Sequence, residues 1–239
     1  MSRERSPRMT MLAFCLLPFI GAGAAEAADV FVVHGIPGGD LGLAPELTVD
    51  IAVNGSCLLP GAQFGNVAGP VNLDPGAYDI KISLADPGNP CGGALAVTAN
   101  VDVGIAPASI VIAHLDQNGG PVISKFTTKT ATVDPAEARI TVYHTAAAPK
   151  VDLRLNRDPG HERAAAVQGL ANGEQTFPAD LAAGGYRALI SPASGRPDRF
   201  LPAIADIPVT LSGGSATAVF AVGSLDNQTF NVIPVAVIE

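Results

Sequence analysis

Residues 30–34 read Val-Phe-Val-Val-His, and residues 140–144 read Ile-Thr-Val-Tyr-His. Each run is rich in β-branched or aromatic residues, which is typical of a β-strand. The closing histidines, His34 and His144, are 110 residues apart. Two versions of one strand at this separation indicate a chain built from a repeated β module.

Two further matches follow in the same order. Residues 49–54 match residues 151–156, and residues 73–78 match residues 181–186. The separation is 102 residues at Asp50 and Asp152, because the first copy has a longer Gly- and Pro-rich loop at residues 35–47. Three matches in the same order predict a duplicated domain.

Other short runs either alternate between apolar and polar residues or are rich in β-branched residues, and turn residues separate them. They lie at residues 80–84, 95–103, 109–115, 122–126, 204–211, 215–222 and 229–238. Short strands at this spacing are typical of an all-β sandwich. Residues 162–169 have room for two helical turns at most.

The fold class predicted is therefore all-β: two tandem immunoglobulin-like antiparallel β-sandwich domains after an N-terminal signal peptide. The predicted bounds are a signal peptide at 1–27, a first domain at 28–126, a linker at 127–137 and a second domain at 138–239. The linker is polar and contains a proline, with no strand pattern.

The N-terminus has the three parts of a secretory leader. Arginines at positions 3, 5 and 8 precede an apolar run at residues 9–22, and Ala25-Glu26-Ala27 forms a small-x-small cleavage site. The apolar run is shorter than the roughly 20 residues that a spanning helix needs. We expect a secreted, periplasmic or cell-envelope protein without a membrane span in the mature chain. An uncleaved anchor and a lipoprotein attached through Cys15 are the alternatives.

Removal of the leader leaves two cysteines, Cys57 and Cys91, 34 residues apart. In an oxidising compartment a disulfide between them is the expected state, with two free buried thiols as the alternative. Neither has another Cys or a His at metal-ligand spacing, so a zinc site is not expected.

The composition limits the classes of partner. The chain has 239 residues, 48% of them hydrophobic and 15% charged, with a net charge of −8. This composition supports a packed core, and the acidic balance argues against nucleic acid and anionic lipid surfaces as partners. Aromatic residues make up 5% and Trp is absent, so the flat stacking platforms of many sugar sites are scarce.

Tyr78 and Tyr186 follow Leu-x-Pro-Gly-x and Leu-x-x-Gly-x. Both resemble a tyrosine corner, in which the hydroxyl hydrogen-bonds back to the upstream backbone. We expect a structural role for both rings.

Together these motifs resemble the DUF4397 family: a strand ending in His, a short loop, Val-Asp at the start of a strand ending in Asn, and Leu-x-Pro-Gly-x-Tyr. The pattern occurs twice and covers nearly all of the chain after the leader. The resemblance implies an extracytoplasmic β-sandwich domain, often in tandem, on bacterial secreted or envelope proteins, with no established activity.

Four residues recur in pairs and could carry chemistry: His34 with Asp50, and His144 with Asp152. If the strands pair, each imidazole could donate to its carboxylate as a structural polar latch. A metal site would need more ligands, for which only Asp40 and Glu46 are at hand in the first copy. His114 and His161 are expected at the surface or at strand ends, and no catalytic, cofactor-binding or metal residue is predicted.

These observations favour an exported, non-enzymatic protein with a structural or adhesive role, whose partner would be cell wall, polysaccharide or protein. One alternative is a carbohydrate- or peptide-binding module that uses sandwich-end loops such as residues 35–47. Exposure of Phe64 or Tyr143 in a groove would favour it. A second alternative is a hydrolase built on the His/Asp pairs, which would need a nucleophile and an oxyanion hole beside them.

Overall fold

The computed structural model describes residues 27–105, 108–129 and 134–238, so nearly all of the predicted signal peptide lies outside the described residues. The described chain is all-β with one short 3-10 helix, η1 (Gly38–Leu41), which confirms the predicted fold class. Among these residues, no helix is long and apolar enough to cross a membrane.

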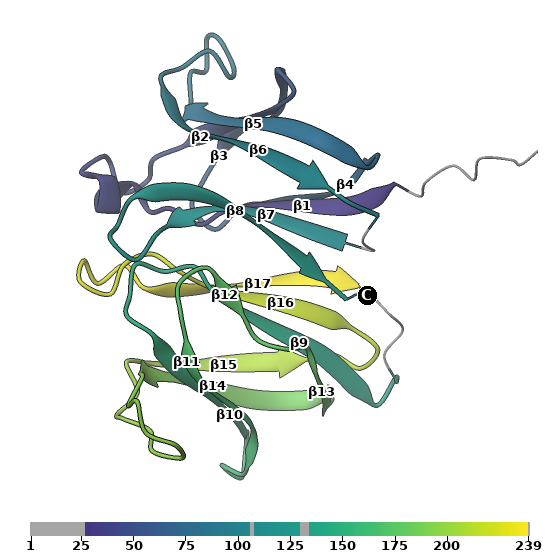
Figure 1. Cartoon of the computed structure of the whole chain (residues 1–239), viewed down its shortest axis with the longest axis vertical. Helices are drawn as coiled ribbons and strands as arrows, with labels where there is room; N and C mark the ends of the chain where they lie inside the picture. Colours follow the sequence, from purple (N-terminus) through teal and green to yellow (C-terminus); the bar gives the residue numbers. More distant parts are fainter. Residues whose placement is uncertain (1–26, 106–107, 130–133, 239) are drawn as a thin grey trace, which may run out of the picture.

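The first eight strands form two facing sheets (Figure 1). One sheet has the order β4-β1-β7-β8 and the other the order β3-β2-β5-β6. The strands are β1 (Ala28–His34), β2 (Val49–Val53), β3 (Ser56–Ala62), β4 (Val67–Leu73), β5 (Gly76–Leu84), β6 (Leu95–Val103), β7 (Ala108–Leu115) and β8 (Pro121–Thr128). We call this unit the first sandwich.

The remaining strands form a second sandwich with the same arrangement. Its sheets have the orders β12-β9-β16-β17, with β13 also paired to β9, and β11-β10-β14-β15. The strands are β9 (Glu137–His144), β10 (Val151–Arg157), β11 (Arg163–Leu170), β12 (Glu174–Gln175), β13 (Ala179–Ala182), β14 (Gly184–Pro192), β15 (Ala205–Leu211), β16 (Ala216–Val222) and β17 (Asn231–Ile238). β12 and β13 together occupy the place of β4.

Most strand pairs are antiparallel, but each sandwich has one parallel pair, β1 with β7 and β9 with β16. These are inner strands of the two sheets that face each other across the middle of the molecule. Every residue of β7 is buried. Burial on both faces explains why residues 110–113 of β7 are all apolar rather than alternating with polar residues.

The two sandwiches pack into four layers (Figure 1). On β1, Val30 and Val32 face the core of the first sandwich, whereas Phe31 and Val33 face the second sandwich. The side chains between the sandwiches form one continuous buried cluster, which we call the central apolar layer. It contains Phe31, Val33, Ala108, Ile110, Ile112 and Phe126 from the first sandwich and Tyr143, Ala216, Ala218, Phe220, Val222, Ile233, Val235 and Val237 from the second. The sandwiches therefore share a core.

Polar contacts join the same two units at one end. The carboxylate of Asp40, in η1, accepts hydrogen bonds from Asn227 Nδ2 at 2.9 Å and Thr229 Oγ1 at 2.6 Å. Asn172 Nδ2 donates to the carbonyl oxygens of Leu115 and Ala146 at 2.9 and 2.7 Å. These bonds tie loops of one sandwich to the other.

The structure differs from two of the expectations about local structure. Residues 162–169 are not helical, because β11 occupies Arg163–Leu170 as an edge strand beside β10. The predicted linker at 127–137 is shorter at both ends, since β8 continues to Thr128 and β9 begins at Glu137.

Candidate functional site

The carboxylate of Asp50 is buried and binds backbone rather than a histidine. It accepts hydrogen bonds from the N–H groups of Gly61 at 2.7 Å, Cys91 at 2.8 Å and Asp86 at 3.3 Å. Burial raises the pKa of this carboxyl, but the three hydrogen bonds outweigh burial and hold the pKa below its usual value. Asp50 thus fastens strand β3 and the loop after β5 to strand β2.

Asp152 does the same in the second sandwich. Its carboxylate is buried and accepts hydrogen bonds from Gly169 N–H at 2.9 Å and Ser194 N–H at 3.1 Å. Gly61 and Gly169 have φ values of 67° and 72°, and the ladder register shifts beside each. Each aspartate therefore stabilises a β-bulge, and the glycine in each bulge adopts the positive φ that the bulge requires.

His34 does not meet Asp50. Its side chain is 2% exposed, and neither Nδ1 nor Nε2 has a hydrogen-bond partner among the described residues. Burial lowers its pKa to about 4. The expected imidazole–carboxylate latch is absent here, because His34 lies on the inner face of β1, like Val30 and Val32, whereas Asp50 lies on the outer face of β2.

The second pair is also separate. His144 is fully buried, its Nε2 donates to the carbonyl oxygen of Pro149 at 3.0 Å, and burial lowers its pKa. His114, expected at the surface or at a strand end, lies near the end of β7 but is 1% exposed. Its Nδ1 donates to the Leu115 carbonyl and its Nε2 meets Ser124 Oγ, each at 2.8 Å. In the part of the chain that the structure describes, no three His, Cys, Asp or Glu residues are grouped as metal ligands.

The other residues predicted to have structural roles form a disulfide and two side-chain hydrogen bonds. Cys57 and Cys91 form a disulfide, with Cα atoms 5.7 Å apart, which confirms that prediction. Tyr78 Oη donates to the Asp74 carbonyl at 2.8 Å, and Tyr186 Oη donates to the Ala182 carbonyl at 2.6 Å. Both are the hydrogen bonds expected of a tyrosine corner.

Neither of the two aromatic residues that would favour a binding groove at the sandwich-end loops is exposed. Tyr143 is fully buried in the central apolar layer, and Phe64 packs partly buried against the same layer. Residues 35–47 carry Asp40, whose carboxylate is taken up by Asn227 and Thr229. That loop therefore braces the two sandwiches.

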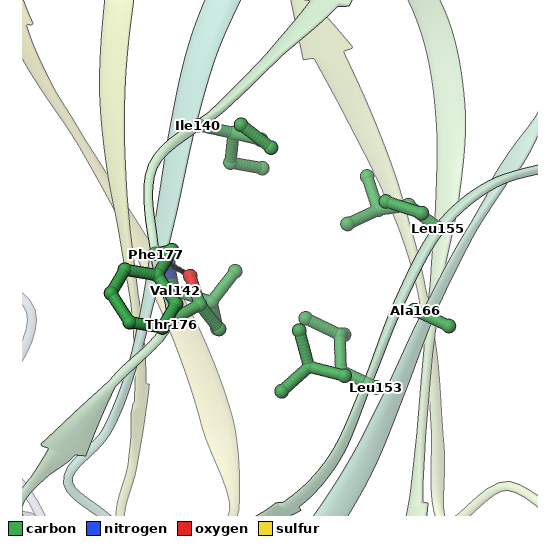
Figure 2. A pocket seen from close by; sticks show the side chains of 10 residues that line it. Ile140, Val142, Leu153, Leu155, Ala166, Thr176 and Phe177 are labelled. Atoms are coloured by element: carbon green, nitrogen blue, oxygen red, sulfur yellow. Dashed lines mark hydrogen bonds between the residues drawn. The ribbon is translucent and has the colours of Figure 1, made fainter.

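An apolar slot opens at one edge of the second sandwich. Figure 2 shows Ile140 and Val142 on one side, Leu153 and Leu155 on the other, and Phe177 at the rim. The cavity volume is about 30 Å³, close to the space of a single water molecule. Phe177 is 95% exposed, yet a slot of this size cannot take a ligand without rearrangement.

A larger hollow lies on the outer side of β11. It consists of two adjoining pockets of about 420 and 390 Å³, both lined by Gln168. Lys150 and Arg196 line the first, and Arg163 and Phe200 line the second. We call this surface the Gln168 groove. Both pockets are shallow and open to solvent, and sequence reasoning missed this surface because its cations are far apart along the chain.

Comparison with known proteins gives a family match and distant structural likenesses. The family model described as "Domain of unknown function (DUF4397)" matches residues 28–154, the first sandwich together with β9 and the first half of β10. No curated protein matches the chain.

Three solved structures are reported for their similarity to the chain. The Bacillus anthracis TIE protein has 9% identity and a TM-score of 0.28, with 82% of this chain and 34% of that chain covered. A CBM26 module of Eubacterium rectale Amy13K, solved with maltoheptaose, has 9% identity and a TM-score of 0.27, with 85% and 95% covered. A leucine-rich repeat protein of Bacteroides thetaiotaomicron has 12% identity and a TM-score of 0.22, with 83% and 26% covered. The chain spans about a third of the TIE protein's length.

Proposed function

The chain belongs to the DUF4397 family, and we propose on that premise that it is an exported, non-enzymatic protein of the cell envelope or exterior with a structural or adhesive role. The observation that carries this proposal is the central apolar layer, which joins the two sandwiches through buried side chains of both. A continuous core resists relative motion of the two units, as a spacer or an adhesive stalk requires.

Export is supported by the disulfide. Cys57 is exposed and Cys91 is half-buried, so the bond is within reach of cellular reductants. Such a bond persists in an oxidising compartment rather than in the cytosol.

A non-enzymatic role is supported by the state of three of the four histidines. His34, His114 and His144 are buried, and burial lowers the pKa of each. An imidazole in this position is enclosed by the core and does not meet a substrate from solvent.

We also propose that the second sandwich is a second copy of the family domain. Its sheets have the strand orders of the first, Asp152 repeats the bonding of Asp50, and Tyr186 repeats that of Tyr78.

The test is to express the full-length chain in the organism that encodes it, fractionate the cells and assay the purified protein for saturable binding to envelope material. We expect the protein outside the cytoplasm, with its disulfide formed, and retained on the envelope. Reduced protein in the cytoplasm, or exported protein without saturable binding to any envelope material, would overturn the proposal.

A further inference from the structure

Positive charge is concentrated in the second half of this acidic chain. Residues 28–126 carry two basic and nine acidic side chains, whereas residues 127–239 carry nine basic and eleven acidic ones. Most of the basic residues of the second half lie on or beside the sheet β11-β10-β14-β15. They are Lys150, Arg154, Arg157, Arg163, Arg187, Arg196 and Arg199. Acidic residues lie in the same region, and Asp206 pairs with Arg187, so this part of the molecule is of mixed charge, whereas the first sandwich is strongly acidic.

Four of these cations are exposed and lie at or beside the Gln168 groove: Lys150, Arg163 and Arg196 line it, and Arg199 is joined to Gln168 through its backbone carbonyl. Ion pairs among the described residues join Lys81 to Asp79, Arg139 to Asp180 and Arg187 to Asp206. None of the four groove cations belongs to such a pair. Their charge is therefore available to an anion from solvent.

The loop that carries two of these arginines is held in place. Gln168 Nε2 donates to the carbonyls of Arg196 at 3.2 Å and Arg199 at 3.0 Å, and Gln168 Oε1 accepts from Asp198 N–H at 3.1 Å. The Ser194 hydroxyl, which has one proton to donate, lies 2.6 Å from the Arg199 carbonyl oxygen and 3.0 Å from the Arg196 carbonyl oxygen. A loop fixed through its backbone loses little freedom when a ligand binds its side chains.

The groove lining contains three cations, two carboxylates and one aromatic ring, and the carboxylates are those of Asp152 in the first pocket and Asp198 in the second. Lys150 and Arg196 line one pocket, Arg163 lines the other, and Gln168 lies between them. Phe200 lines the second pocket, and the guanidinium of Arg154 sits 4.8 Å from its ring centroid. The small side chains of residues 164–166, all alanines, form part of the wall of the second pocket.

We propose that the Gln168 groove binds an acidic polysaccharide, a glycan chain with carboxylates at regular intervals. Guanidinium groups bind carboxylates through paired hydrogen bonds, and cations in both pockets match a ligand whose charges repeat along its length. Phe200 provides an apolar surface for a sugar ring, and Asp198 provides an acceptor for hydroxyl groups. The acidic remainder of the molecule repels a polyanion, so binding is confined to the groove.

This inference names the class of polymer to which the protein would adhere. It rests on the proposed function, because a protein of the envelope or exterior meets such polymers. The test uses the full-length chain, expressed through an export pathway and purified with its disulfide formed. Affinity electrophoresis and calorimetry would measure binding to polygalacturonate, with uncharged pullulan and polyglutamate as comparison polymers.

The informative variant is Arg163→Ala with Arg196→Ala, and its matched control is Lys81→Ala with Lys125→Ala, which removes the same charge from the first sandwich. We expect saturable binding of polygalacturonate by the wild-type protein and the control. We expect at least a tenfold loss in the groove variant and weaker binding in 0.5 M salt, because salt screens exposed charges.

Three results would overturn the inference: no binding of polygalacturonate, an equal loss in both variants, or equal binding of pullulan. If the wild-type protein binds polyglutamate as tightly as polygalacturonate, and the groove variant loses this binding, the ligand of the groove is an acidic polypeptide rather than a glycan. If the exported protein binds envelope material but not polygalacturonate, the inference fails while the proposed function stands. If polygalacturonate binds but the protein is found reduced in the cytoplasm, the proposed function fails while the groove stands.

Discussion

Tyr143 and Phe220 stack in the central apolar layer, with ring centroids 4.4 Å apart and planes inclined by 14°. Both side chains are fully buried. Phe126 of the first sandwich meets Tyr143 edge-on, with centroids 4.8 Å apart. Phe126 therefore packs across the interface against two rings of the second sandwich, which couples the stability of one sandwich to the other.

Replacing Phe220 by Ala should lower the free energy of unfolding by about 3–5 kcal/mol, because it leaves a cavity where a buried aromatic ring was. Urea denaturation followed by circular dichroism measures this loss. The wild-type protein should unfold in one transition, since the two sandwiches share this core. Phe177→Ala, at a side chain that is 95% exposed, is the control and should change little. Two separate wild-type transitions, or equal losses in both variants, would contradict the coupling.

Asp50→Ala should lower the free energy of unfolding by about 1–3 kcal/mol, because it removes the acceptor of the part-buried N–H groups of Gly61 and Cys91. Asp152→Ala should have an effect of the same order through Gly169 and Ser194. Asp102→Ala, at an exposed carboxylate, is the matched control. Thermal denaturation of the three variants provides the comparison, and a loss at Asp50 no larger than that at Asp102 would refute the role assigned to the buried aspartates.

The sequence allows prediction of the elements whose pattern is strong. The alternation of Val49, Ile51 and Val53, the spacing of the two cysteines and the Gly-x-Tyr motifs predict strand β2, the disulfide and the tyrosine corners. The edge strands β3, β4 and β11 are not predictable in this way, because most of their residues are exposed or small and no apolar face repeats. Their existence follows from pairing with inner strands.

The partners of the paired aspartates could not be predicted from the sequence either. His34 and Asp50 are close along the chain, but their strands belong to different sheets. Side chains alternate between faces along a strand, so a residue's face depends on the register of the whole ladder. The four-layer packing left one sign in the sequence, the four successive apolar residues 110–113 of β7, which are typical of a strand buried on both faces.

Removing the disulfide should destabilise the protein by about 3–4 kcal/mol in the chain-entropy model, because the bond closes a loop over a separation of 34 residues. The double variant Cys57→Ser with Cys91→Ser is compared with the wild-type protein in urea, each with and without dithiothreitol. Dithiothreitol should lower the stability of the wild-type protein to that of the variant and leave the variant unchanged. A wild-type protein whose stability is insensitive to complete reduction would contradict this prediction.

His34 should make stability depend on pH in mildly acidic solution. Its pKa falls from 6.5 in the unfolded chain to about 4 in the fold because burial penalises the charged ring. Between these values the unfolded state binds more protons, so stability is full above pH 6.5 and decreases as the pH falls toward 4. The loss attributable to His34 is about 3 kcal/mol by linkage. His114 and His144, whose pKa values burial also lowers, add to the same trend.

His34→Leu should flatten this pH dependence without lowering stability at pH 5. Both ring nitrogens of His34 lack hydrogen-bond partners, so an apolar side chain of similar size gives up no bond and removes the cost of burying polar atoms. Urea denaturation from pH 4 to pH 8 measures the slope. His161→Asn is the control, because this histidine is exposed and its φ of 58° suits Asn. If His34→Leu retains the wild-type slope and is less stable at every pH, the imidazole has a bonding partner in solution and the prediction is wrong.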